Sequence, residues 1–113
     1  MQERRQIIRR EDVHITVHQC IAKGAIGETW LTVTGLDVSA AGLRISSAQN
    51  LESGVNLFIL ATVVGRDGQG FDFSTDCVVI HSRQTADGLW IAGLIFVDLN
   101  STIKNQLAAV LNS

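Results

Sequence analysis

Four arginines lie close to the start of the chain, at Arg4, Arg5, Arg9 and Arg10. An arginine can meet a phosphate with two parallel charge-assisted hydrogen bonds, and it can also bond the O6 and N7 edge of guanine or stack on the base. Several arginines in one short segment therefore suit a ligand that carries both phosphates and guanine. Taken alone, the segment is as typical of a solvated tail or of a weak patch for anionic surfaces.

A second group of polar residues lies within the segment Asp-Val-Ser-Ala-Ala-Gly at residues 37–42. The carboxylate of Asp37 could accept hydrogen bonds from guanine N1 and N2, and Ser39 could donate to a phosphate or accept from a base. Gly42 would permit a backbone bend with positive φ close to a ligand. The more common role of such a segment is a turn in which Ser39 bonds its own backbone, and that role is compatible with binding.

The elements that must position these residues are mainly strands. Apolar and polar residues alternate with a period of two in much of the chain, as in a strand that buries one face. Asp67-Gly68 and Asp87-Gly88 are strong turn signals. Six strands are expected, over about residues 12–21, 29–34, 43–45, 57–64, 71–79 and 89–97.

The pattern changes at the end of the chain, where Asn100 or Ser101 can cap a helix over residues 100–113. Its apolar positions recur at intervals of three and four residues, at Ile103, Leu107, Val110 and Leu111. Six sequential strands joined by short turns are most simply closed into a small antiparallel β-barrel. The predicted fold class is therefore all-β with one C-terminal helix packed on the barrel.

The two polar groups, in this strand context, resemble the PilZ domain family, whose members bind cyclic di-GMP through an RxxxR motif and a [DN]xSxxG motif on a six-stranded barrel. Here Arg5-Gln6-Ile7-Ile8-Arg9 supplies RxxxR, preceded by Glu3-Arg4. Asp37, Ser39 and Gly42 supply the second motif, and residues 93–99 are similar to the last strand of the family. Neither short motif is specific alone, but the strand context supports them together.

The resemblance implies a single domain with three parts: a flexible arm at residues 1–11, a barrel at residues 12–99 and the helix. Arg5 and Arg9 would bond the guanine edges and phosphates, flanked by Arg4 and Arg10. Asp37 and Ser39 would complete the pocket, and Gly42 would shape the turn. A basic residue just before RxxxR can contact a second ligand molecule in some members, so Arg4 favours a stacked pair. The family further implies a role in bacterial motility, biofilm or virulence control.

Charge and composition limit the alternatives. Of the 113 residues, 46% are hydrophobic and 18% are charged, which is enough apolar surface for a folded domain. Residues 1–10 are basic and the remainder is acidic, whereas a nucleic-acid-coating domain normally spreads basic residues over a face. The longest nearly apolar run, Leu57 to Val64, is too short for a membrane helix. No apolar signal-peptide core follows the basic start, so we expect a cytoplasmic protein without membrane insertion.

Several other residues are of types that could have a functional role, but a structural role is the simpler interpretation. His14 and His18 would lie roughly 13 Å apart on a strand, too far to share a metal ion, and are expected on the sheet surface. Cys20 and Cys77 are expected as buried thiols. The two tryptophans, Trp30 and Trp90, are expected in the barrel core or against the helix, although a tryptophan near the barrel mouth could stack on a base. Arg44 and Arg83 could supplement the pocket, although surface charges are the more common case.

The leading hypothesis is a receptor module without catalytic residues, cofactor or metal. Cyclic di-GMP would order the arm against the barrel, and an unknown partner protein would recognise the changed surface. The alternatives are an adaptor of the same fold that acts without nucleotide and, with less support, a barrel that binds single-stranded nucleic acid. An enzyme finds no support in any nucleophile elbow, phosphate-cradling loop or metal-ligand spacing.

Overall fold

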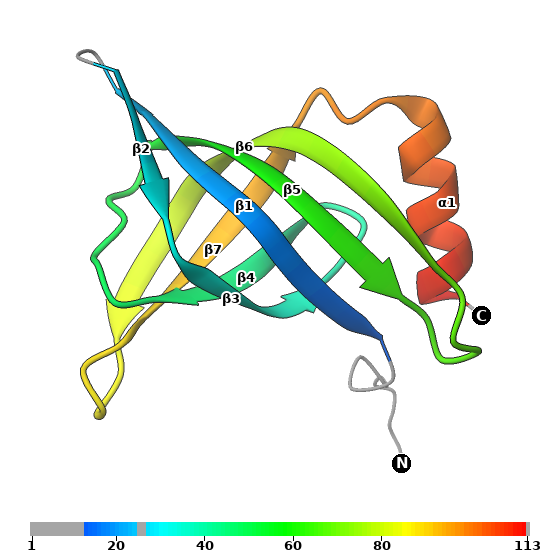
Figure 1. Ribbon diagram of the computed structural model, residues 1–113, viewed down its shortest axis with the longest axis horizontal. Coiled ribbons are helices and arrows are strands. Elements are labelled where there is room, and N and C mark those ends of the chain that lie inside the picture. The colour runs from blue at the N-terminus through cyan, green and yellow to red at the C-terminus, as the bar shows by residue number, and fades with distance from the viewer. Residues whose placement is uncertain (1–12, 25–26, 113) are drawn as a thin grey trace.

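The computed structural model describes residues 13–24 and 27–112. Seven strands are followed by one helix (Figure 1). In chain order these are β1 (His14–Gly24), β2 (Gly27–Leu31), β3 (Val33–Val38), β4 (Gly42–Ser47), β5 (Asn56–Val64), β6 (Gly70–Gln84), β7 (Trp90–Val97) and α1 (Ser101–Leu111).

All paired strands are antiparallel and form one sheet in the order β2-β1-β5-β6-β7-β4-β3. The sheet curls into a nearly closed barrel, which confirms the predicted fold class but not the strand number. The expected strand at residues 29–34 is two strands, because the chain leaves β1 after Leu31 and begins to pair with β4 at Val33. The break at Thr32 therefore separates strands at opposite ends of the sheet.

The barrel nearly closes where β1 and β3 come into contact without forming a ladder. Gly35 on β3 makes this approach possible, since a Cβ atom there would lie 2.8 Å from the carbonyl oxygen of Ile15 and 3.0 Å from its Cγ2. The start of β1 is consequently held beside the end of β3 (Figure 1).

Alternating residues of β5 fill the interior, where Leu57, Ile59 and Ala61 are inaccessible to solvent. The helix adds Leu107, which is also fully buried, with Ile103 and Val110 packed around it. Asn100 caps this helix, because its side-chain oxygen accepts a 2.9 Å bond from the backbone N–H of Ile103.

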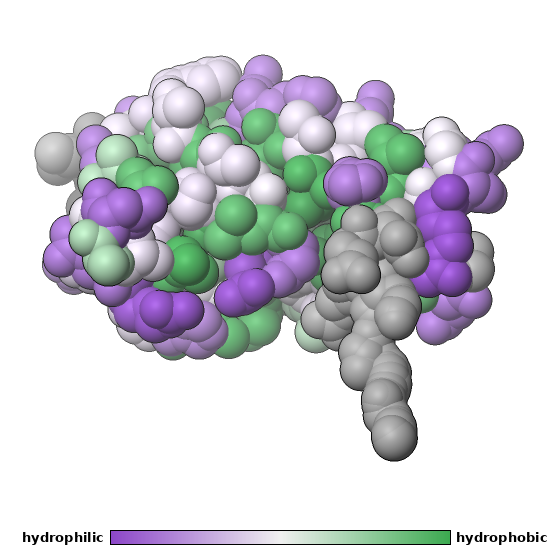
Figure 2. Space-filling model, turned by 90° about the horizontal axis from the view of Figure 1, so that it is seen from below, coloured by the Kyte–Doolittle hydropathy of each residue, from purple (hydrophilic) through white to green (hydrophobic). Residues whose placement is uncertain are grey.

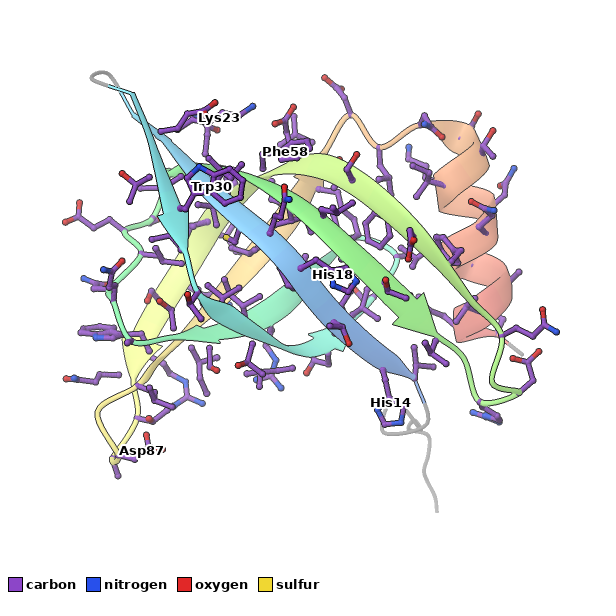
Figure 3. All side chains as sticks on the ribbon, in the orientation of Figure 1. His14, His18, Lys23, Trp30, Phe58 and Asp87 are labelled. Carbon is purple, nitrogen blue, oxygen red and sulfur yellow. The ribbon has the colours of Figure 1, made fainter. Side chains whose placement is uncertain are left out.

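The expectation that Trp30 lies in the core is wrong. Trp30 is on the outer face of β2 and is 64% exposed. On the same face of the neighbouring strands, Ile21 faces both Trp30 and Phe58 in the ladder. Figure 3 places Trp30 near Lys23 and Phe58, and the Lys23 ammonium lies 5.6 Å from the Phe58 ring centroid. Trp30 and Phe58 thus lie on either side of Ile21 on the outer face instead of entering the barrel.

Candidate functional site

Four residues on adjacent strands form a row across the outer face of the barrel. His81 on β6 faces Gly93 on β7, Gly93 faces Arg44 on β4, and Arg44 faces Asp37 on β3. The row depends on two irregularities in register, one between Val79 and His81 and one between Gly35 and Asp37. A bulge adds one residue to a strand and changes the face on which the following side chain points.

Asp37 and Arg44 form the only ion pair of this row in the described part of the chain. Arg44 donates from Nε at 2.8 Å and from Nη2 at 2.5 Å, both to Oδ2 of Asp37. The side chain of Asp37 is 24% exposed and that of Arg44 is 48% exposed. The hydrogen bond to Asp37, and then its negative charge, raise the pKa of Arg44, so the guanidinium stays cationic.

Ser39 holds the turn between β3 and β4 together. Its backbone N–H donates to the carbonyl of Gly42 at 2.8 Å. Its hydroxyl oxygen also accepts from the N–H groups of Ala41 and Gly42, each at 3.3 Å, and lies 3.3 Å from the Gly42 carbonyl. Ser39 therefore has the turn role that the sequence suggested, and in this position it still lies beside Asp37 in the pocket lining.

Gly42 is required for a steric reason that differs from the predicted one. Its φ is not positive, so the expectation of a left-handed bend is wrong. A Cβ atom at Gly42 would lie 1.8 Å from the carbonyl oxygen of Leu94 and 2.9 Å from Cα of Ile95. Only a glycine lets the start of β4 lie this close to β7.

Gly93 makes room for His81 in the same way. A Cβ atom at Gly93 would lie 2.5 Å from Nε2 and 2.7 Å from Cε1 of the imidazole. The ring of His81 therefore lies over the glycine and presents an exposed aromatic surface next to the ion pair. Such a surface is suited to stacking with a base.

These residues surround one pocket of 380 Å³ on the outer face of the barrel. It is lined by Asp37, Ser39, Ala41, Gly42, Leu43, Arg44, Ile80, His81, Gly93, Leu94 and Ile95. The predicted residues of the second motif are thus brought together. The predicted residues of the first motif, Arg4, Arg5, Arg9 and Arg10, lie outside the described residues.

Comparison with protein families gives a match between residues 3–113 and the PilZ domain. The chain belongs to the PilZ domain family. PilZ domains are a family of cyclic di-GMP-binding effector domains. The match extends over both motifs and every described strand. A search of curated proteins gives no match.

Arg44 lines the pocket, the less common of the two roles that the sequence suggested for it, while Arg83 does not. The sequence did not indicate two further contributions, those of His81 and Gly93. His81 and Gly93 come from β6 and β7, and their proximity depends on a bulge in a long-range pairing. Short-range patterns do not specify that pairing.

A chain of polar side chains lies on another part of the outer surface. His18 Nε2 lies 2.6 Å from Oγ1 of Thr62, which donates at 2.5 Å to Oδ1 of Asp72. This chain of bonds joins β1, β5 and β6. His18 lies on the exposed face of β1, as expected (Figure 3). Over residues 13–24 and 27–112, no cluster of three His, Cys, Asp or Glu residues is arranged to hold a metal ion.

Both cysteines are buried, as predicted, and neither forms a disulfide. Burial raises the pKa of the Cys20 thiol to about 11. Burial also raises the pKa of the Cys77 thiol to about 12, with smaller contributions from the charges of Cys20 and Asp76. These thiols are protonated packing groups at neutral pH, and they lie outside the residues that line the pocket.

Proposed function

We propose that this PilZ domain is a receptor module for cyclic di-GMP and has no catalytic role. The observation that carries the proposal is the single pocket that joins Asp37, Ser39 and Gly42 with Arg44 and His81. The pocket offers carboxylate and hydroxyl groups for a base edge, a cation and an imidazole face, which together suit a purine nucleotide.

The N-terminal arginines would complete the site from the other side of the ligand. Val13 is buried in the core, and β1 begins beside β3, the strand that carries Asp37. Four residues of chain span at most about 14 Å, so Arg9 can lie no further than this from Val13. The proposal requires the RxxxR segment to reach the pocket from this start of β1. Arg5 and Arg9 would bond guanine edges and phosphates, with Arg4 and Arg10 beside them.

Ligand binding would order this arm, residues 1–11, against the barrel and change the surface that a partner protein meets. The change would follow from the differential affinity of the ligand for the ordered state. Arg4, just before the RxxxR motif, supports binding of two stacked ligand molecules. We place the protein in the cytoplasm. Of the described segments, none is a helix with the length and apolar character needed to cross a membrane.

Isothermal titration of cyclic di-GMP into the wild-type chain and into an Arg5→Ala/Arg9→Ala variant tests the proposal. For the wild type we expect a dissociation constant in the micromolar range or below and about two ligands bound per chain. The variant should bind with at least a hundredfold lower affinity. GTP serves as the control nucleotide. Arg83→Ala/Lys104→Ala removes the same charge outside the pocket and should bind normally. If millimolar cyclic di-GMP causes neither heat nor chemical-shift changes, the proposed receptor function is excluded.

A nucleotide-independent adaptor is the second candidate, and an exposed apolar surface favours it. Ile80, Ile95 and Val97 on β6 and β7 are 47%, 38% and 39% exposed. Figure 2 shows apolar residues interspersed with polar ones over one side of the molecule. Exposed apolar patches commonly mark protein-protein contacts. If a partner binds the Arg5→Ala/Arg9→Ala variant and the wild type equally, with and without cyclic di-GMP, the adaptor is the better account.

A further inference from the structure

We infer that Arg44 is a positioning residue for the guanine contact of Asp37, an inference that rests on the proposed cyclic di-GMP site. Both guanidinium donors bond the same carboxylate oxygen, Oδ2. A carboxylate has about four acceptor positions. Oδ1 accepts no hydrogen bond from the described part of the chain, so Asp37 can hold Arg44 and still accept from a base.

The backbone is arranged to make this pair. Asp37 and Arg44 are directly opposite in the β3–β4 ladder only because Leu36 is an extra residue in β3. Without that irregularity, Asp37 would lie two positions after Gly35 in a regular strand and would face the same way, into the barrel. Val38, which is now buried, would then face outward. The bulge therefore places the carboxylate on the outer face, and Arg44 restricts its orientation there.

The charge of Arg44 is also suited to the ligand. Cyclic di-GMP has two phosphodiesters, and a carboxylate without a cation would repel them. Arg44 offsets the charge of Asp37 at a distance of 2.5 Å while it remains part of the pocket lining. Asp37 can then serve as an acceptor for guanine N1 and N2 without making the pocket electrostatically unfavourable.

Two other roles are conceivable for the same arginine and give different results. Arg44 could compete with the ligand for Asp37, in which case its removal would strengthen binding. It could contact the phosphates itself, in which case its removal would weaken binding whether or not Asp37 is ionised. A positioning residue acts through Asp37, so its effect depends on the carboxylate.

Titrations of cyclic di-GMP into the wild-type chain and into Arg44→Gln, Arg44→Lys, Asp37→Asn and Asp37→Asn/Arg44→Gln separate these roles. We expect Arg44→Gln to weaken binding at least tenfold, and Arg44→Lys to recover part of this loss. In the Asp37→Asn background, Arg44→Gln should change affinity less than threefold. Arg83→Gln, an exposed arginine outside the pocket lining, should leave affinity unchanged.

A second ligand provides a readout that general damage to the fold would not change. Cyclic di-IMP lacks the guanine 2-amino group, so the wild type should prefer cyclic di-GMP and Arg44→Gln should reduce that preference. Unchanged or tighter binding by Arg44→Gln, or an equal loss in the Asp37→Asn background, would overturn the positioning role while the receptor function stands. Absence of binding by the wild type would instead overturn the proposed function, and this inference with it.

Discussion

Gly42 has the least space of any glycine that the structure describes. A methyl group there would overlap the Leu94 carbonyl, so β4 would have to move away from β7. We expect Gly42→Ala to lower the free energy of unfolding by about 3 kcal/mol, the upper end of the usual cost of overpacking, because the methyl group meets backbone atoms. Urea denaturation measures this change.

Gly24→Ala is the matched control for that experiment. A Cβ atom at Gly24 would make only an ordinary contact, 3.5 Å from the Gly27 carbonyl, and φ at Gly24 is not positive. We expect it to change stability by less than about 1 kcal/mol. Equal effects of the two substitutions would show that the approach of β4 to β7 does not explain why Gly42 is required.

The buried thiols make stability depend on pH at the alkaline end. In the unfolded chain both ionise near the ordinary pKa of 9.0, whereas the folded values are about 11 for Cys20 and about 12 for Cys77. The folded state therefore holds these protons more tightly. Their contribution is fully present below pH 9 and is lost as the pH rises towards 11 and 12.

The free energy of unfolding should accordingly fall above pH 9 by up to about 1.4 kcal/mol per pH unit for each thiol. Urea denaturation at several pH values, in the wild type and in Cys20→Ala/Cys77→Ala, isolates this component. We expect the variant to have a flatter dependence between pH 9 and 11. Parallel curves would mean that the two thiols do not control alkaline stability.

The sequence could predict those site residues that are close to one another in the chain. Asp37, Ser39 and Gly42 are close in sequence and could be assigned to one turn. Arg44 and His81 could not be assigned from spacing alone, since the position of one requires the bulge at Leu36 and that of the other a bulge near Ile80. Bulges depend on how distant strands pair, and the local pattern does not specify them.

At the scale of elements, α1 contributes to the core mainly through Leu107. We expect Leu107→Ala to lower the free energy of unfolding by about 2–5 kcal/mol, because the helix would lose its one fully buried side chain and leave a cavity. Thermal or urea denaturation provides the measurement.

Gln106→Ala, at the neighbouring exposed position, is the control and should change stability by less than about 0.5 kcal/mol. A loss below about 1 kcal/mol in Leu107→Ala would indicate that the barrel is stable without the packing of the helix.

Most elements could be predicted because their local signals agree. The turns at Gly68 and Gly88 have positive φ, as their Asp-Gly pairs indicate, and Asn100 caps the helix. The division of the second expected strand could not be predicted. Thr-Trp-Leu-Thr-Val-Thr alternates without a glycine or proline, and the chain divides there because its two halves pair with different strands.

At the scale of the whole molecule, barrel closure brings the start of β1 to the strand that carries Asp37. The two motifs are separated in sequence by β1 and β2. The contact of β1 with β3 nevertheless places the start of β1 next to β3, the strand of Asp37. A ligand held by both motifs would link the arm to the barrel. The exposed apolar side chains of Ile80 and Ile95 line the same pocket, so its occupation would also change what a partner meets.

The most direct test of this account is amide chemical-shift mapping of the ¹⁵N-labelled chain during titration with cyclic di-GMP. We predict the largest changes in residues 37–44, at His81 and in residues 93–95, with little change in α1 or around Trp30. Absence of shifts at millimolar ligand, or shifts confined to the Trp30 end of the sheet, would contradict the assignment of this pocket as the cyclic di-GMP site.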